Sequence, residues 1–320
     1  MIKLGIVGAS GLVGQSILEV LKEEKMLKKF SITLIASGKS SGKVLMFNKQ
    51  EYRLVSLDDN VVNMCFDYVI FSAGDEISKQ WVPRFAEKGT VVIDNTNAFR
   101  RFKGIPLIVP EINFDKLSEN NKIISNPNCS TIQLAVVLDR IMKQWKINDV
   151  VVSSYQSVSG AGRDALKDLI NGSNLYFKKG IKNNIIPQIG DILENGFCVE
   201  EDKIMFESNK VLNSNLNIIA TTVRVPIAYC HGESVYIRFG NEVKLNQLKT
   251  AIECDYIKVC EDIVYPSEIE KTNLTYVCRI RAKSKNEVVM FVIANNLRRG
   301  AAYNAVLILK KLLEKYKVNG

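Results

Sequence analysis

Histidine is almost absent from this sequence, since His231 is the single one among 320 residues. The seven cysteines include no C-x-x-C pair. The Cys/His spacings of zinc sites are therefore missing, and we predict no metal. An odd number of cysteines without such pairs indicates free thiols in a reducing, cytoplasmic compartment.

Long apolar runs are also missing: none reaches the length of a membrane span, so no membrane partner is predicted. The opening residues, MIKLGIVGAS, begin a strand at once, so no signal or transit peptide is expected. The net charge is +9, but lysines are mixed with acids, as in LKEEKMLKK, and no basic block is interleaved with aromatics. We therefore predict no nucleic-acid partner. A positive field suits an anionic small substrate or cofactor, and solvated lysine-rich faces are the alternative interpretation.

The chain is long enough for two domains with sizeable cores, because 47% of its residues are hydrophobic. Up to about residue 125, strand-like KLGIV, SITLIAS, DYVIFSAG, GTVVIDN and IPLIVPE alternate with helical QSILEVLKEE and SKQWVPRFAEKG. This alternation predicts a Rossmann-type, doubly wound parallel sheet. After about residue 150, longer β-rich segments are broken by helical GRDALKDLINGS and VKLNQLKTAIE, which predicts an α+β domain with a mixed, largely antiparallel sheet. An amphipathic helix, AAYNAVLILKKLLEKYK, follows near the end.

The segment GASGLVG places Gly8, Gly11 and Gly14 between the first strand and the first helix. Such glycines permit a tight turn and close approach of a pyrophosphate to a helix N-terminus. We therefore predict a dinucleotide site, and a tight turn without a ligand is the alternative.

The second strand lacks the terminal carboxylate that NAD sites usually place on the ribose hydroxyls. It ends instead in Ala36, Ser37, Gly38, Lys39 and Ser40. A lysine and several hydroxyls can hold a 2′-phosphate, which favours NADP. An ordinary polar loop is the alternative.

The segment SNPNCST, residues 125–131, places Cys129 at the expected first turn of an apolar helix. Free N–H groups and the helix dipole there favour an anion, which lowers a thiol pKa and makes the thiolate a better nucleophile. Combined with a nicotinamide cofactor, such a thiol suggests aldehyde oxidation through a thioester. A small residue that merely fills a helix start is the alternative.

The thioester scheme needs an acid–base group near the sulfur, and His231 is the only imidazole. Arg224 lies seven residues before it in RVPIAYCHGESV. If the two flank a turn, both can face one cleft. A structural role is the alternative for a lone histidine.

The sequence resembles the aspartate-semialdehyde dehydrogenases nearly end to end. SNPNCSTIQ resembles the nucleophile segment of this family, YQSVSGAG its glutamine-bearing strand, RVPIAYCHGESV its arginine–histidine segment and NNLRRGAAYN its C-terminal cofactor segment. The resemblance implies an NADP-binding domain at 1–128 plus 297–320, with the last helix packed on it. It also implies a catalytic and dimerisation domain at 129–296 that joins a homodimer.

The resemblance also implies roles for individual residues. Cys129 would form the acyl-thioester, His231 would accept and donate protons, and Gln156 would orient the substrate. Implied substrate and phosphate contacts are Arg224 for the α-carboxylate, Glu200 for the amino group, and Arg100, Asn128 and Lys203 for phosphate. With the glycine turn and the second-strand loop, the predicted NADP contacts are Gly8, Ser10, Gly11, Leu12, Val13, Ser37, Lys39, Ser40, Ser159, Gly160 and Asn296.

The implied reaction interconverts L-aspartate 4-semialdehyde, phosphate and NADP with 4-phospho-L-aspartate and NADPH. It would run reductively, towards diaminopimelate and lysine, threonine and methionine. One alternative is N-acetyl-γ-glutamyl-phosphate reductase, which has an aromatic residue and a proline after its cysteine, where NCSTIQ has neither. The other is a non-catalytic NADP-binding regulatory protein, expected to lose part of a Cys/Gln/Arg/His set that is intact here.

Five positions depart from the family pattern: Lys39 for arginine, Asp75 for glycine, Asp202 for an aromatic, Gly232 for serine and Asn295 for aspartate. The acid at Asp75 is expected to crowd or redirect the loop beneath the cofactor.

Overall fold

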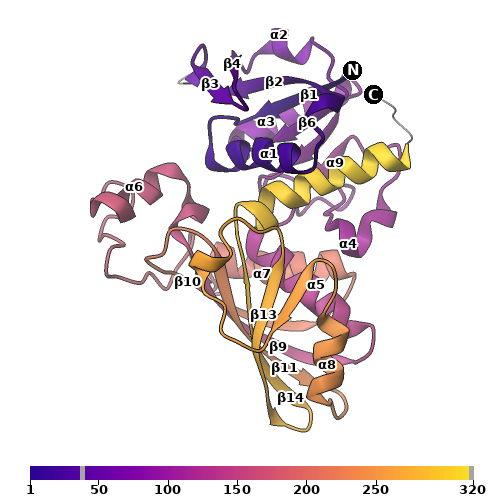
Figure 1. Ribbon diagram of the computed structural model, residues 1–320, viewed down its shortest axis with the longest axis vertical. Helices are drawn as coiled ribbons and strands as arrows, with labels where there is room; N and C mark the ends of the chain where they lie inside the picture. The colour runs from indigo at the N-terminus through magenta and orange to yellow at the C-terminus, as the bar shows by residue number, and fades with distance from the viewer. Residues whose placement is uncertain (37–39, 317–320) are drawn as a thin grey trace. The chain divides into compact units, whose positions relative to one another are not determined.

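The computed structural model describes residues 1–36 and 40–316. The chain forms two compact units: Met1–Pro127 with the segment from Ala301 onward, and Asn128–Gly300. Each unit contains a sheet of its own (Figure 1). Within the described residues, no helix is long and apolar enough to cross a membrane.

The first unit is built on a parallel sheet with the strand order β5-β2-β1-β6-β7-β8. From β1 the chain adds β2 on one side and later β6, β7 and β8 on the other, which is a doubly wound arrangement. The strands are β1 (Ile2–Val7), β2 (Phe30–Ala36), β5 (Val55–Ser56), β6 (Tyr68–Phe71), β7 (Val91–Asp94) and β8 (Ile123–Ser125). The parallel sheet expected from the sequence is confirmed.

Two apolar cores cover the faces of this sheet, because successive strand residues point to opposite sides. Leu4 and Ile6 of β1 pack in one core with Leu309, whereas Val7 packs in the other with Phe85. The helices are α1 (Leu12–Glu23), α2 (Asp59–Val62), α3 (Asp75–Glu87), α4 (Pro110–Asn113) and α9 (Tyr303–Lys315), with 3₁₀ turns at Leu27–Lys29 and Phe114–Lys116. Helix α9 packs against α1, so residues from both ends of the chain build one core.

The second unit has a mixed sheet with the order β10-β9-β11-β14-β13-β12. The outer pairs β10–β9 and β12–β13 are parallel, and the pairs between them are antiparallel. The strands are β9 (Ile147–Gln156), β10 (Asn217–Arg224), β11 (His231–Phe239), β12 (Ile257–Cys260), β13 (Thr275–Ser284) and β14 (Glu287–Ala294). This confirms the mixed, largely antiparallel sheet expected from the sequence.

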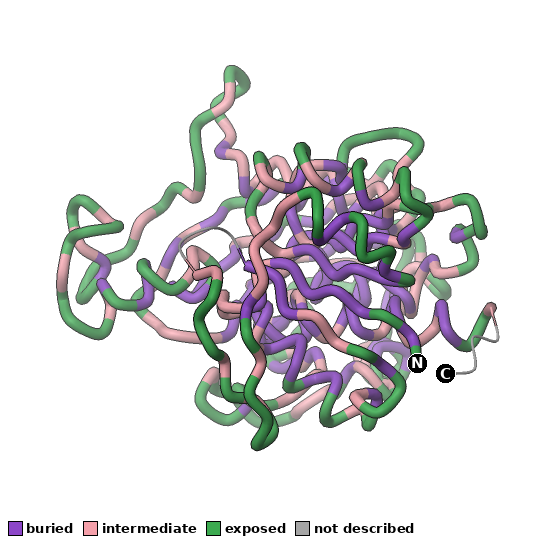
Figure 2. The backbone as a smooth tube through the Cα atoms, turned by 90° about the horizontal axis from the view of Figure 1, so that it is seen from above, coloured by how far each residue is buried: buried purple, intermediate pink, exposed green. Residues whose placement is uncertain are grey.

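Helices pack against this second sheet. Their bounds are α5 (Cys129–Met142), α6 (Arg163–Asn171), α7 (Val199–Leu212) and α8 (Leu245–Ile252), with 3₁₀ turns at Val158–Ala161 and Pro266–Glu268 and a π-helix at Arg298–Ala302. Helix α5 contacts β11 and β14, α7 contacts β10, and α8 contacts β12 and β13. Burial alternates along β9: Val150 and Val152 are buried, whereas Val151 is 39% exposed and Tyr155 is 40% exposed. In Figure 2, exposed residues lie mainly in the outer loops and buried residues lie inside.

Two local expectations were wrong or incomplete. The segment IPLIVPE is not a strand, because only an isolated bridge joins Leu107 to Ser125 and Pro110 begins α4. Proline has no N–H to donate to a sheet, and its fixed φ suits a first helical turn. The sequence analysis also missed the antiparallel hairpin of β3 (Val44–Phe47) and β4 (Gln50–Arg53).

Candidate active site

Three strand ends meet at one edge of the second sheet. Strand β9 ends at Gln156 and β10 ends at Arg224, and the two residues are register partners in a parallel pair. Strand β11 runs antiparallel to β9 and begins at His231, next to the pair Gly232–Tyr155. Three residues predicted from two separate segments therefore lie at the same edge.

Cys129 is the first residue of α5, and the preceding Asn128 caps the helix. The Asn128 Oδ1 accepts the N–H groups of Ser130 at 2.9 Å and Thr131 at 3.3 Å. Asparagine is a favoured N-cap because its side chain replaces the missing acceptors of the first turn. On another side, a Cβ on Gly300 would lie 2.6 Å from the Cβ of Cys129. The sulfur-bearing residue is thus fixed by a capped turn and by close backbone packing.

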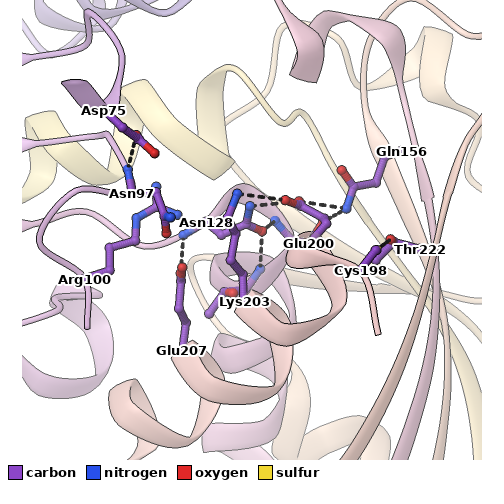
Figure 3. A network of polar contacts seen from close by, with 12 residues as sticks. Asp75, Asn97, Arg100, Asn128, Gln156, Cys198, Glu200, Lys203, Glu207 and Thr222 are labelled. Atoms are coloured by element: carbon purple, nitrogen blue, oxygen red, sulfur yellow. Dashed lines mark hydrogen bonds and ion pairs between the residues drawn. The ribbon is translucent and has the colours of Figure 1, made fainter. Parts of the chain in front are cut away.

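Glu200 joins several of the predicted residues by hydrogen bonds (Figure 3). Its Oε1 accepts from the Asn128 amide at 2.9 Å and from the Gln156 amide at 3.0 Å, and its Oε2 lies 3.3 Å from the Lys203 ammonium. Burial alone would raise the pKa of Glu200, but the Lys203 charge, these amides and Arg224 together hold it below its ordinary value. Glu200 is therefore a buried anion.

Arg224 and His231 both border Gly160, in the 3₁₀ turn that follows β9. A Cβ at Gly160 would lie 2.9 Å from Nη1 of Arg224 and 3.1 Å from Nε2 of His231. The Arg224 guanidinium donates from Nη1 to the Ser157 carbonyl at 2.7 Å. Burial lowers the pKa of Arg224, and the charges of Glu200 and Cys129 oppose that shift. Glycine at 160 therefore leaves space where these cationic and imidazole groups converge.

The protonation of His231 differs from the near-neutral titration expected for a catalytic imidazole. Burial, followed by the Arg224 charge, lowers its pKa to about 3. Its Nδ1 accepts the Ser157 N–H at 3.0 Å, so the neutral ring carries its proton on Nε2. Among the described residues Nε2 has no hydrogen-bond partner. His231 therefore presents an unused N–H donor to this edge of the sheet.

Two residues predicted to contact the cofactor, Ser159 and Asn296, touch each other in the second unit. The Asn296 amide nitrogen lies 3.0 Å from the Ser159 hydroxyl, and its Oδ1 accepts from the Ser157 hydroxyl at 3.1 Å and the Cys230 N–H at 3.0 Å. This cluster continues directly from the turn that holds Gly160.

The glycine turn belongs to the first unit and fits a phosphate. Gly8 has φ +82° and its Cβ would lie 2.1 Å from the Ser72 carbonyl oxygen, while a Cβ on Gly14 would lie 2.4 Å from the Gly8 carbonyl oxygen. Both glycines are thus required by the tight turn itself. The N-terminus of α1 at Leu12 has no side-chain cap from the described residues. The N–H groups of its first turn, at Leu12 and Val13, are of the kind that a pyrophosphate uses as donors.

The remaining predicted residues are placed as follows. The Ser40 carbonyl accepts the Lys43 N–H in a turn. Ser10 is half-buried beside Gly11. Ser37 and Lys39 lie outside the described residues. Arg100 is buried in the first unit and donates to the Asn95 carbonyl at 2.8 Å.

Asp75 does not crowd its loop. It begins α3, where a helix dipole favours an acid, and its carboxylate accepts the Asn97 N–H at 2.9 Å (Figure 3). The bond ties α3 to the segment that leads to Arg100. The departure from glycine therefore has a structural use within the first unit.

The other departures from the family pattern also fit their surroundings. A Cβ on Gly232 would lie 2.5 Å from the tip of the Phe291 ring, so a serine there would require that ring to shift. The Asn295 Oδ1 accepts the N–H groups of Leu297 and Arg298, as an aspartate would. Asp202 stands with other acids in the first turn of α7, where the helix dipole favours them.

Two residues that hold the site together were not predicted from the sequence. Ser157 fixes the imidazole through its N–H, and Glu207 accepts the backbone N–H of Asn128 at 2.6 Å. Glu207 was recognisable only as an acid on the apolar side of α7, four residues after Lys203. Its partner is distant in the sequence, so no local pattern could identify the contact.

Comparison with known proteins agrees with this arrangement. Residues 3–120 match the family model "Semialdehyde dehydrogenase, NAD binding domain", and residues 138–299 match "Semialdehyde dehydrogenase, dimerisation domain". The aspartate-semialdehyde dehydrogenase of Aquifex aeolicus is 38% identical over 335 residues, which cover 98% of each chain. That of Bacillus subtilis is 34% identical over 336 residues, covering 97% of this chain and 96% of its own.

A solved structure extends the likeness to the fold. The crystal structure of aspartate semialdehyde dehydrogenase II from Vibrio cholerae is 36% identical, with a TM-score of 0.92, covering 98% of this chain and 99% of that one. The same enzyme complexed with ASA gives a TM-score of 0.93 at 35% identity, with 99% of each chain covered. The resemblance seen in the sequence is confirmed: the chain belongs to the aspartate-semialdehyde dehydrogenase family, oxidoreductases of amino-acid biosynthesis with a nicotinamide-dinucleotide-binding domain and a dimerisation domain.

Proposed function

We propose that this protein catalyses the NADP-dependent reaction L-aspartate 4-semialdehyde + phosphate + NADP⁺ ⇌ 4-phospho-L-aspartate + NADPH + H⁺. In the cell it would run towards the semialdehyde and supply lysine, threonine and methionine synthesis. The observation that carries the proposal is Cys129 at the capped start of α5, in the unit that also groups Gln156, Arg224 and His231. The free state of all seven cysteines suits the proposed cytoplasmic location.

Cys129 is the proposed nucleophile. Its thiolate would attack C4 of 4-phospho-L-aspartate, form the C–S bond and expel phosphate, leaving an acyl-thioester on the enzyme. The N–H groups at the start of α5 and the Arg224 guanidinium supply positive potential near the sulfur. Gln156 is held by Ser130 and Glu200, so its amide can orient the substrate without reorganising.

His231 would act on the substrate oxygen. NADPH, when bound, supplies the hydride that reduces the thioester. The reduced carbon then carries an oxygen with negative charge, and the neutral Nε2–H of His231 can donate to it. In the opposite direction the same Nε2–H would donate to the oxyanion that forms when the Cys129 thiolate attacks the aldehyde carbon. Collapse of the hemithioacetal releases the aldehyde and regenerates the Cys129 thiolate.

The α-carboxylate and the α-ammonium of the substrate would each bind a residue of opposite charge in the second unit. Arg224 would hold the α-carboxylate bidentately, and the buried Glu200 anion would hold the α-ammonium. We assign phosphate binding to Arg100, Lys203 and Asn128, whose charges or amide suit an anion. Lys203 lies 3.3 Å from Glu200, and it would keep part of this contact while it binds phosphate.

We assign the cofactor contacts residue by residue. Gly8, Ser10, Gly11, Leu12 and Val13 would contact the pyrophosphate, with Ser159, Gly160 and Asn296 towards the nicotinamide. Ser37, Lys39 and Ser40 would contact the 2′-phosphate, and the lack of a carboxylate after Ala36 supports NADP over NAD. The NADP-binding domain would comprise residues 1–128 and 297–320, and the catalytic and dimerisation domain would comprise residues 129–296.

The direct assay is NADPH formation from aspartate semialdehyde with and without inorganic phosphate, with NAD⁺ run in parallel. We expect absorbance at the nicotinamide band only when phosphate is present, and a much lower rate with NAD⁺. A phosphate-independent rate would contradict the phosphorylating reaction, and equal rates would contradict the NADP assignment.

Arg224→Lys is expected to reduce kcat/KM by about 10²-fold. Lysine keeps the charge but lacks the two parallel N–H donors that fix a carboxylate, and small misplacements are costly to rate. Steady-state kinetics with aspartate semialdehyde provide the measurement. Thermal melts control for lost packing, because Arg224 is buried. A variant with normal kinetics would remove Arg224 from the carboxylate site.

We further propose a homodimer joined through the accessible face of the second sheet. Along β9 and β10, Val151, Tyr155 and Ile219 are each at least 39% exposed, which is unusual for one sheet face. Sedimentation should give about twice the 35.9 kDa chain mass. Val151→Glu should shift it to the monomer, and a monomeric wild type at micromolar concentration would contradict the proposal.

A further inference from the structure

Glu233 is a fully buried acid that the proposed mechanism does not use. It lies on β11 two residues after His231, so both side chains point to the same face of the sheet. Neither of its carboxyl oxygens is within hydrogen-bonding geometry of a partner among the described residues. The side chains that interact with it are those of Gln133 and Ser130, on the first turns of α5.

The environment of Glu233 favours the protonated, neutral form of its carboxyl group. Burial raises its pKa well above the ordinary value of 4.5, and the interactions with Gln133 and Ser130 only oppose that rise. An unpaired carboxylate at such a site would be strongly disfavoured. Its register partners on β14 and β9 are the neutral residues Val292 and Ser154.

Both partners of Glu233 are connected to the candidate site. Ser130 directly follows Cys129, and its hydroxyl accepts the Gln156 amide at 3.0 Å and lies 3.4 Å from the Ser154 hydroxyl. The Gln133 amide donates to the carbonyl of His231 at 3.3 Å. A change at Glu233 would therefore act through Ser130, which follows Cys129 and holds the Gln156 amide, and through Gln133, which bonds the His231 backbone.

We propose that Glu233 is a positioning residue for Cys129, acting through Ser130 and Gln133. It ties the first turns of α5 to the strand that begins with His231. This inference rests on the proposed role of Cys129 as the nucleophile. Its O–H can donate to the Ser130 hydroxyl or the Gln133 amide oxygen with a small side-chain rotation.

The test compares Glu233→Gln, Glu233→Leu and the control Val235→Ala. Glutamine keeps the size and one donor, so kcat should stay within about threefold of wild type. Leucine removes the polar link, so kcat should fall at least about tenfold, with a smaller change in KM. Val235 is the next buried position on β11, and Val235→Ala should lower Tm while leaving kcat unchanged. If Glu233→Leu keeps normal kcat, or if Val235→Ala loses as much, the proposal is overturned.

A second readout separates this inference from the proposed function. Iodoacetamide alkylation of the Cys129 peptide reports the thiol directly, with the other cysteine peptides as internal references. We expect the Cys129 rate to change in Glu233→Leu and to return towards wild type in Glu233→Gln. Unchanged alkylation in an enzyme that is acylated at Cys129 would overturn only the role of Glu233. Failure of wild-type acylation would instead contradict the nucleophile itself.

The pH dependence of stability gives a third readout. A carboxyl with a raised pKa holds a proton in the folded state that the unfolded chain has already released. Its contribution to stability therefore declines as pH rises above 4.5 towards the folded pKa. Relative to wild type, Glu233→Gln should therefore gain Tm as the pH rises above 4.5. Parallel Tm curves over that range would contradict a buried proton at Glu233.

Discussion

Cys129→Ala is expected to abolish turnover while leaving NADPH binding intact. The substitution removes the atom that forms the covalent intermediate, and losing a nucleophile typically lowers kcat by at least about 10⁴-fold. The fold should survive, because Asn128 still caps α5 and alanine is a good helix former. Steady-state kinetics and NADPH fluorescence titration provide the two measurements.

Cys260→Ala is the matched control for this prediction. Cys260 is also a half-buried free thiol of the second unit, but it lies on β12, outside the candidate site. Its replacement should leave kcat within about twofold of wild type, as for a substitution away from reacting groups. Comparable losses in both variants, or a Cys129→Ala enzyme with measurable normal turnover, would show that the thiol of Cys129 is not the nucleophile.

His231→Asn is expected to lower kcat by about 10²–10⁴-fold, the usual worth of acid–base assistance. The asparagine side-chain oxygen can replace Nδ1 as the acceptor for the Ser157 N–H, so this hydrogen bond is kept. The variant loses the Nε2 proton that the substrate oxygen would use. NADPH affinity and Tm should be near normal, and a near-normal rate would leave His231 a structural residue.

The pH behaviour of His231 follows from its lowered pKa. The unfolded chain takes up the imidazole proton near pH 6.5, whereas the folded state does so only at about 3. The folded protein therefore loses stability as pH falls through that interval, and His231→Asn should be less acid-sensitive. Because the chain has a single histidine, one imidazole NMR signal reports this directly. A titration midpoint near 6.5 in the free enzyme would contradict the neutral, buried ring.

Local patterns in the sequence were sufficient for the main features of the fold. The glycines of residues 8–14 identify the βα turn because that turn requires a positive φ at Gly8 and close backbone approach at Gly14. Cys129 could be placed at a helix start because an asparagine directly precedes it and an apolar run follows it. The change from short alternating elements to long β-rich segments correctly separated a parallel sheet from a mixed one.

What the sequence could not supply depends on contacts between distant segments. Glu207 and Glu233 read as acids on a helix and a strand, and only the packed second unit shows one holding Asn128 and the other buried against α5. The pKa of His231 is set by its burial and by Arg224, neither of which has a sequence signature. IPLIVPE was misassigned because a short apolar run bounded by prolines fits a buried strand and a helix start equally well.

The most direct test of the central claim is mass mapping of the enzyme after mixing it with 4-phospho-L-aspartate in the absence of NADPH. Without a hydride donor the reaction should stop at the thioester, so an aspartyl adduct should accumulate on the peptide that contains Cys129. Hydroxylamine should remove the adduct, and Cys129→Ala should show none. An adduct on any other of the seven cysteines, or no adduct in an enzyme that turns over normally, would contradict the account.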